Sequence, residues 1–397
     1  MTSVPGENVE KRRFDGVLVV GGGYAGLHAA TALQSADVPV SVVDVDANHG
    51  FITRLASVAA GGAPEGDASA PFRELGFSFV QGRVQRVEDG RVTLDDGSVI
   101  EASSVVIAAG SVAAKPPIPG IEHAATLRTT ADALALRRSV ASADEVLIVG
   151  GGATGVQLAG EISLAHPGTT VRLVEEAPTL LAAYGRRLGR DAWGTLTRRG
   201  VLMHLGQRVD RIDPAGLVLN SGRRLDGLVV WVGGFRSVGT VFGGHLPLHD
   251  GRIAVDSDLR VRGWKRTFAA GDVAAHLDDQ GQVLPMSAQI AVQAGTGAAE
   301  NAARLYRGRP TRPVALKQRG WVLDLGGGRG VADLGGIELV GPLLGRLAPV
   351  LHTAIDVKNL LEIGGLGGLR FLPGTHRPRT DTTPLPVPSD ELLAAAA

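Results

Sequence analysis

The sequence contains no cysteine among its 397 residues. This absence excludes disulfide scaffolds, zinc sites with cysteine ligands, iron–sulfur clusters and every mechanism that uses a thiol. Any redox activity of this chain must therefore come from a bound cofactor.

An excess of charge of either sign is missing too. Lys and Arg total 40, Asp and Glu total 40, and the formal net charge is zero. Such a chain has no overall attraction to phosphate backbones or to anionic lipid. Nucleic acid is therefore not expected as a partner.

A long uninterrupted apolar segment is also absent. The longest apolar stretch, 334–357, is broken by Glu338, Pro342, Arg346 and Pro349, so it falls short of the roughly 18 residues that a membrane-spanning helix needs. The first residues are charged through Arg13 and carry no cleavage pattern of an export signal. We expect a soluble cytoplasmic protein of two or three domains.

What the sequence does have is an internal near-repeat. VLVVGGGYAGLHAATAL at 17–33 and VLIVGGGATGVQLAGEI at 146–162 align without a gap. In each copy a run of β-favouring residues meets three glycines, and a helical pattern follows, which is the start of a βαβ unit. The repeat therefore predicts two separate doubly wound units.

The first copy carries a dinucleotide-binding pattern at Gly21, Gly23 and Gly26. The first glycine allows a tight turn, the second lets the backbone approach a pyrophosphate, and the third lets the helix pack on the strand. Asp44, 18 residues after Gly26, ends the next strand, where a carboxylate can accept hydrogen bonds from a ribose. Taken alone, the pattern also fits an ordinary strand–helix turn.

The second copy, with Gly150, Gly152 and Gly155, argues against the interpretation of the first as an ordinary strand–helix turn. Glu175 lies 20 residues after Gly155, again at the end of a strand. Two dinucleotide sites in one chain suit an enzyme that passes electrons between two such cofactors. Glu175 and the adjacent Glu176 would repel a 2′-phosphate and favour NADH over NADPH, unless folding brings the arginines at 186–187 close.

We expect an α/β fold with two Rossmann-like doubly wound domains, the first of them discontinuous, and a small C-terminal domain. Asp95–Gly97 predicts a hairpin turn, and prolines at 116–119 predict a linker. The predicted segments are 14–115 and 249–310 for the first domain, 116–248 for the second, 311–372 for the C-terminal domain, and 373–397 for a disordered tail.

The motifs of the sequence, taken in order, resemble those of a known superfamily. The two glycine motifs, VVIAAG at 105–110, WVGG at 231–234, FAAGD at 268–272 and LPMSAQIAVQAG at 284–295 occur in the order found in two-dinucleotide flavoproteins. The last segment is similar to that of type II NADH dehydrogenases and their ferroptosis-suppressor-like and apoptosis-inducing-factor-like relatives. The resemblance covers roughly 14–340.

The resemblance implies FAD on the first unit and NAD(P)H on the second, with Asp272 bonded to the FAD ribityl or pyrophosphate. Beyond the two acids and Asp272, the cofactor-binding residues that it implies are Gly21, Gly23, Tyr24, Ala25, Gly26, Ala109, Gly110, Gly150, Gly152, Ala153, Thr154, Gly155, Gly233, Gly271, Ala288 and Gln289.

Three glutamines are the predicted catalytic residues. A helix starting near 285–286 would aim its N–H groups at the flavin edge, and Gln289 and Gln293 share one face of it. By resemblance this face looks onto the flavin and the acceptor pocket; otherwise the pair is two solvated glutamines. At Gln157 relatives usually carry a glutamate, and an amide cannot take a proton. Glu161 is either its substitute or an exposed helix acid.

The remaining features narrow the expectation further. The segment 343–363 has no aromatic residue and few basic ones, so at most weak membrane association is expected. The ten histidines form no zinc-binding arrangement, and no metal is expected. His49, with Phe51 and Arg54, either approaches the flavin or belongs to a structural loop.

The predicted function is that of an FAD-dependent oxidoreductase. It would take hydride from NAD(P)H, preferably NADH, and pass electrons to a quinone or another small acceptor. The alternatives are a slow redox-sensing or interaction flavoprotein of the apoptosis-inducing-factor-like type and a flavoenzyme of specialised metabolism. A homodimer is left open.

Overall fold

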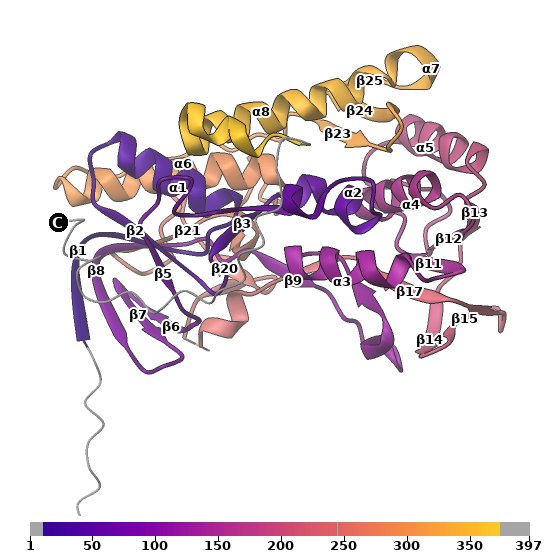
Figure 1. Ribbon diagram of the computed structural model, residues 1–397. Coiled ribbons are helices and arrows are strands. Elements are labelled where there is room, and N and C mark those ends of the chain that lie inside the picture. The colour runs from indigo at the N-terminus through magenta and orange to yellow at the C-terminus, as the bar shows by residue number, and fades with distance from the viewer. Residues whose placement is uncertain (1–10, 244, 374–397) are drawn as a thin grey trace, which may run out of the picture.

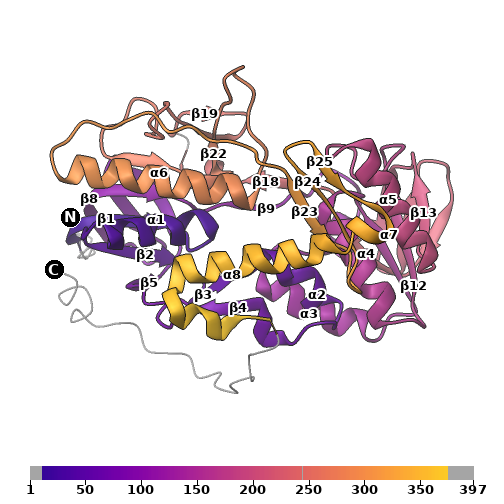
Figure 2. The same cartoon turned by 90° about the horizontal axis from the view of Figure 1, so that it is seen from above.

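The computed structural model describes residues 11–243 and 245–373. Figures 1 and 2 show two α/β halves side by side, with residues 321–373 crossing over both. Of the helices within the described residues, none combines the length and hydropathy that a bilayer-spanning segment requires. The predicted disordered tail lies outside the described residues, apart from Pro373.

The first half is built on a seven-stranded sheet with the order β5-β2-β1-β8-β7-β6, to which β21 adds through β8. Strands β1, β2, β5, β8 and β21 run parallel to one another, whereas β7 pairs antiparallel with both β8 and β6. The strands are β1 (Lys11–Val20), β2 (Val40–Asp44), β5 (Phe79–Gln81), β6 (Val84–Glu88), β7 (Arg91–Leu94), β8 (Val99–Ile107) and β21 (Thr267–Ala269).

Helices α1 (Tyr24–Ser35) and α6 (Ala288–Tyr306) pack on this sheet and on each other. Gly295 permits the close approach, because a Cβ there would lie 2.0 Å from the carbonyl oxygen of Ala25. Strand β21 pairs with β8, although the residues of the second half lie between these two strands in the sequence. The first half is therefore discontinuous in sequence. The predicted turn at 95–97 connects β7 to β8, and Gly97 has a φ of +83°.

The second half has a five-stranded parallel sheet with the order β10-β17-β11-β12-β13. Its strands are β10 (Ala125–Thr126), β11 (Glu145–Val149), β12 (Thr170–Glu175), β13 (Leu202–Leu205) and β17 (Leu228–Trp231), and its helices are α3 (Thr130–Val140), α4 (Ala153–Ala165) and α5 (Arg186–Arg198). A small antiparallel sheet of β14 (Val209–Asp213), β15 (Gly216–Leu219) and β16 (Arg224–Asp226) shares a core with this sheet.

Two strands link the halves: β9 (Ser111–Ala113) pairs with β18 (Phe235–Ser237). The chain then passes through β19 (Leu248–His249), β20 (Arg252–Ala254) and β22 (Ala274–Ala275). One helix of the first half packs into the core of the second, which the sequence pattern did not predict. It is α2 (Leu55–Ala59), and it contacts α3 and α4.

The C-terminal unit contains β23 (Trp321–Asp324), β24 (Gly330–Leu334), β25 (Ile337–Leu339), α7 (Gly341–Leu344) and α8 (Leu347–Gly368). Its sheet packs against α4 and α5, while α8 packs against α1 (Figure 2). A non-helical Gly365 (φ 55°) kinks the end of α8. The C-terminal unit thus forms a second connection between the two halves.

Candidate functional site

The first glycine-rich turn joins β1 to α1 and has one specific geometry for each glycine. Gly21 has a φ of +102°, and a Cβ there would lie 2.5 Å from the carbonyl oxygen of Ala108. At Gly26 a Cβ would lie 1.8 Å from the carbonyl oxygen of Gly21. Gly23 differs, because nothing lies within 4 Å of its Cβ position. The first and third glycines serve the fold, whereas the second faces open space.

The second turn, between β11 and α4, repeats this geometry. Gly150 has a φ of +118°, with Gly233 only 2.9 Å from its Cβ position. A Cβ at Gly155 would lie 1.8 Å from the carbonyl oxygen of Gly150, and Gly152 again faces open space. We call Gly21, Gly23 and Gly26 the first cradle and Gly150, Gly152 and Gly155 the second. Each offers a pyrophosphate free space at a helix N-terminus.

Each cradle is held by the acid that ends the next strand. Asp44 accepts from the backbone N–H of Gly22 at 2.6 Å, and Glu175 accepts from that of Gly151 at 2.5 Å. Burial raises the pKa of Asp44. A carboxylate has about four acceptor sites, so each acid can also accept from a ribose diol. The contact of each acid with a ribose stays a prediction. The structure shows in addition that each acid supports its own glycine-rich turn.

Asp272 lies where the first half meets the linking strand β9 and the loop between β10 and α3 of the second half. It accepts from Arg128 Nη2 at 2.8 Å and from Ser111 Oγ at 2.7 Å. The guanidinium of Arg128 stacks over the ring of Phe235, 4.7 Å from its centroid. Sequence reasoning missed Arg128, because it lies 144 residues from Asp272 in a segment without a motif.

Gly271 brings Asp272 next to the first cradle. It follows β21 with a φ of +76°, and its Cβ position is 2.9 Å from the Cβ of Ala25. Its N–H donates to Nε2 of the buried His276 at 3.1 Å. The predicted residues Ala109 and Gly110 follow β8, and Ala288 begins α6. These positions all follow the carboxyl ends of parallel strands or begin α6, at one edge of the sheet.

Gln289 and Gln293 were expected to face the flavin and the acceptor pocket. In the structure both side chains are hydrogen-bonded to the backbone of a neighbouring segment. Gln289 donates to the carbonyl oxygen of Gly320 at 2.6 Å and accepts from the N–H of Arg319 at 2.7 Å. Gln293 exchanges hydrogen bonds with both backbone groups of Lys317. The two amides therefore hold segment 317–320 against α6, so their catalytic role stays a prediction. The helix itself begins at Ala288, capped by Ser287, slightly later than predicted.

Gln157 is half-buried on α4, and its side chain makes no hydrogen bond within the described residues. Glu161, one turn later on the same face, lies where α2, α4 and the loop after β23 meet. It bonds Ser57, and burial and the charge of Asp324 raise its pKa. This burial excludes the alternative that Glu161 is an exposed acid on the surface of the helix.

His49 supports the first cradle from behind. Its Nδ1 donates to the carbonyl oxygen of Gly22 at 2.9 Å, and its ring packs edge-on against Tyr24 and Phe51. Burial lowers the pKa of His49 to about 4, so the ring is neutral at pH 7. This geometry favours the structural alternative for His49.

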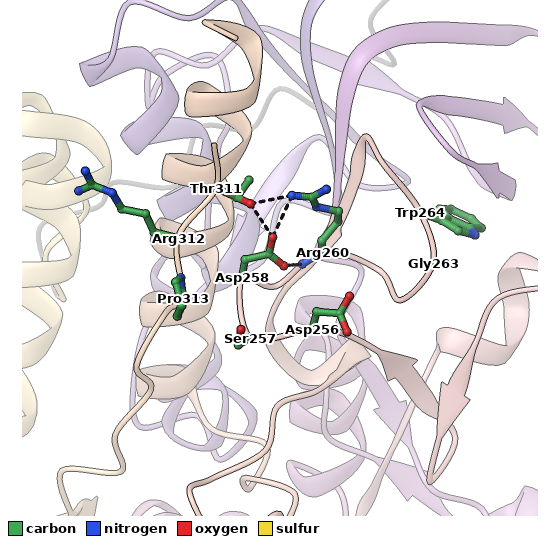
Figure 3. A pocket seen from close by; sticks show the side chains of 9 residues that line it. All are labelled: Asp256, Ser257, Asp258, Arg260, Gly263, Trp264, Thr311, Arg312 and Pro313. Carbon is green, nitrogen blue, oxygen red and sulfur yellow. Dashed lines mark hydrogen bonds and ion pairs between the residues drawn. The ribbon is translucent and has the colours of Figure 1, made fainter. Parts of the chain in front are cut away.

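An open pocket of about 500 Å³ lies elsewhere, around Arg260, Trp264 and Thr311. Figure 3 shows Arg260 and Thr311 both bonded to Asp258. Its lining residues at 256–264 precede β21 and those at 311–313 follow the end of α6, whereas the cofactor edge follows β21 and includes the start of α6. Ligands of open α/β sheets bind at the carboxyl ends of the strands, so this pocket is separate from the candidate site.

Comparison with known proteins agrees with this geometry. A family model described as pyridine nucleotide-disulphide oxidoreductase matches residues 15–295. The chain belongs to this family. Membership confirms the predicted superfamily and the predicted class of oxidoreductase, with FAD and NAD(P)H as its cofactors. The two open cradles fit both groups.

A curated relative extends the match beyond the family segment. The chain is 27% identical over 391 residues to a type II NADH:quinone oxidoreductase of Staphylococcus aureus (strain NCTC 8325 / PS 47), with 88% of this chain and 96% of the relative covered. The chain is therefore similar to that enzyme through its C-terminal unit as well.

Solved structures show the same fold. NDH2 from Plasmodium falciparum in complex with NADH superposes with a TM-score of 0.76 and 15% identity, covering 91% of this chain and 97% of that one. A ferredoxin reductase from Rhodopseudomonas palustris gives a TM-score of 0.71 and 22% identity, covering 81% and 82%. The α/β prediction with two dinucleotide-binding domains is confirmed.

Proposed function

We propose that the protein is an FAD-dependent oxidoreductase that takes hydride from NADH and passes the electrons to a quinone. The observation that carries this proposal is the duplicated cradle, in which each turn has one open glycine and one supporting acid. The similarity to the type II NADH:quinone oxidoreductase of S. aureus supports the same donor and acceptor. Bound FAD supplies the redox chemistry, and the protein positions the reactants.

The first cradle is the FAD site. Gly23 leaves room for the pyrophosphate, and the free N–H groups at the start of α1 face it. Asp44 would accept from the ribose. Asp272, fixed by Arg128 and Ser111, would accept from a ribityl hydroxyl.

The second cradle is the NADH site, and its electrostatics favour NADH over NADPH. Glu175, which accepts from the N–H of Gly151, would also accept from the ribose, and Glu176 follows it in the sequence. Within the described residues neither arginine of the pair at 186–187 forms an ion pair with these two acids, and Arg187 is paired with Glu338 at 3.6 Å. A 2′-phosphate would therefore meet uncompensated negative charge.

Quinone reduction needs one proton more than NADH supplies. The hydride carries two electrons and one proton, and the quinol product needs two electrons and two protons. Gln157 cannot donate a proton. Glu161, whose pKa is raised by burial, is the carboxyl group of α4 on the same face and can hold this proton.

The testing experiment follows the bound flavin in a stopped-flow instrument. Protein is first mixed with NADH or NADPH, and the reduced protein is then mixed with a series of quinones or with oxygen. We expect fast reduction by NADH, slower reduction by NADPH and multiple turnovers with a quinone. Reduction by NADH without turnover on any quinone would instead favour the redox-sensing alternative.

The C-terminal unit also offers a surface for weak membrane association, where a lipid-soluble quinone would be found. Ile337 and Val350 are 67% and 64% exposed, and Leu343 on α7 is 78% exposed. We expect cosedimentation with neutral phosphatidylcholine vesicles that Leu343→Ser abolishes, whereas Leu202→Ser on the second half leaves it unchanged. Equal sedimentation of both variants would contradict this docking surface. A cytoplasmic location stays a prediction, and the oligomeric state stays open.

A further inference from the structure

An aromatic pair joins the C-terminal unit to the second half. Trp321 is the first residue of β23, and Tyr184 lies in the loop between β12 and α5. Their ring centroids are 4.5 Å apart, with an interplanar angle of 68°. Both side chains are half-buried, so neither ring is fully covered by protein.

The backbone next to each ring is tied to one of the two cofactor sites. On one side, the N–H of Leu181 donates at 2.9 Å to the carbonyl oxygen of Gly151, which lies between two glycines of the second cradle, and the N–H of Tyr184 donates to the carbonyl oxygen of Leu181. On the other side, Trp321 follows Gly320, which Gln289 holds against the first turn of α6. The pair therefore lies between the two sites.

The direction of β23 agrees with this placement. The residues just after it pack along α4, because Leu325 lies against Gly160 and Gly326 lies against Glu161 and Leu164, farther along the helix. Moving back along β23 toward Trp321 therefore leads toward the N-terminal end of α4. Gln157 lies in this part of α4, on the face that Glu161 turns toward the C-terminal unit.

The polar tips of both rings are available to a ligand. The Tyr184 hydroxyl and Trp321 Nε1 have no hydrogen-bond partner among residues 11–243 and 245–373, and neither is among the fully enclosed polar atoms. Burial raises the pKa of Tyr184, so the hydroxyl stays protonated and can donate. Half-buried Tyr and Trp tips normally find a partner.

We propose that Trp321 and Tyr184 form the wall of the acceptor subsite and select a flat, uncharged ring that carries carbonyl oxygens. The rings provide an aromatic surface for stacking, and the O–H and N–H groups donate to the carbonyl oxygens. The inference rests on the proposed function, which it deepens by naming what recognises the acceptor. An inorganic acceptor without a ring gains nothing from this wall.

Equilibrium dialysis of menadione against the oxidised, FAD-loaded protein measures binding without turnover. We expect Trp321→Ala to weaken menadione binding about tenfold, Trp321→Phe to restore most of it, and Tyr184→Phe to weaken it several-fold by removing one donor. Trp193→Ala, at an exposed position of α5, is the matched control and should bind as the wild type does. With NADH as donor, KM for menadione should rise in parallel, whereas ferricyanide reduction should not change.

Two results would overturn the wall: unchanged menadione binding in both Trp321→Ala and Tyr184→Phe, or an equal loss in Trp193→Ala. A wild-type protein that binds menadione through these residues without reducing it would contradict the proposed function and leave the wall standing. A protein that reduces menadione fast, with binding indifferent to these substitutions, would contradict the wall and leave the function standing.

Discussion

At the scale of single residues, the substitution that changes chemistry most is glutamine at position 157. A carboxylate there would lie one turn from Glu161, so each charge would raise the pKa of the other and favour proton transfer. We predict that Gln157→Glu speeds reoxidation of the reduced protein by menadione roughly tenfold or more, because general acid catalysis contributes about 10²–10⁴. Reduction by NADH should change little.

The control at this position is Gln157→Met, which has a similar length and no charge. It should leave both half-reactions near the wild-type rates. If Gln157→Glu and Gln157→Met reoxidise equally fast, position 157 has no part in proton transfer.

Two buried histidines give the cofactor edge a pH dependence. Burial lowers the pKa of both His49 and His276 from 6.5 to about 4. In the unfolded chain they take up protons near pH 6.5, so the unfolded state binds more protons between pH 6.5 and 4. Their contribution is complete above pH 6.5 and is lost as the pH falls toward 4, by about 3 kcal/mol for each histidine.

We predict that the free energy of unfolding, measured with urea from pH 7 to pH 4.5, falls less steeply in His276→Asn than in the wild type. His123→Asn, at an exposed position, should follow the wild-type curve. Parallel curves for the wild type and His276→Asn would show that this ring is not held neutral by burial.

At the scale of elements, α8 is attached to the first half by a buried ion pair. Arg54 Nε donates to Asp356 at 2.8 Å, with both side chains at most 6% exposed, and Arg54 also bonds the carbonyl oxygen of Phe371. Removing one partner leaves a buried charge without compensation, which costs about 3–5 kcal/mol. We predict such a loss of unfolding free energy for Asp356→Ala.

The same helix provides the control. Lys358 pairs with Glu362 on the exposed side of α8, and exposed pairs contribute only about 0–1 kcal/mol. Lys358→Ala should therefore change stability little. Equal losses in the two variants would mean that Asp356 acts through general helix packing instead of through Arg54.

Elements with a local signal could be predicted from the sequence. Both βαβ starts follow from β-favouring runs that meet Gly21 and Gly150, and the hairpin before β8 follows from the turn at Gly97. Contacts over long sequence distances left no such signal. The pairing of Arg128 with Asp272 and the packing of α2 into the second core depend on how the halves meet. The polarity of Gln289 suggested the site, but only the fold shows its amide holding Gly320.

At the scale of the whole molecule, the two halves divide the binding of the two cofactors between them. Each half presents one cradle at the carboxyl edge of its own sheet, and the halves are connected by β9 with β18 and by the C-terminal unit. We propose that the first cradle holds FAD and that the second holds NADH. Changing one cradle should therefore affect one cofactor and not the other.

The most direct measurement is the flavin content and the NADH affinity of Gly23→Val and Gly152→Val. Neither glycine has an atom within 4 Å of its Cβ position or a left-handed φ, and the same is true of Gly168, which serves as control. The protein itself therefore tolerates a side chain at all three positions. At Gly23 and Gly152 the side chain would collide with a bound pyrophosphate, whereas at Gly168 it would meet no cofactor. We predict that Gly23→Val loses FAD, that Gly152→Val keeps FAD but binds NADH at least tenfold more weakly, and that Gly168→Val matches the wild type. Full FAD content in Gly23→Val together with unchanged NADH affinity in Gly152→Val would show that the two cradles do not bind these cofactors.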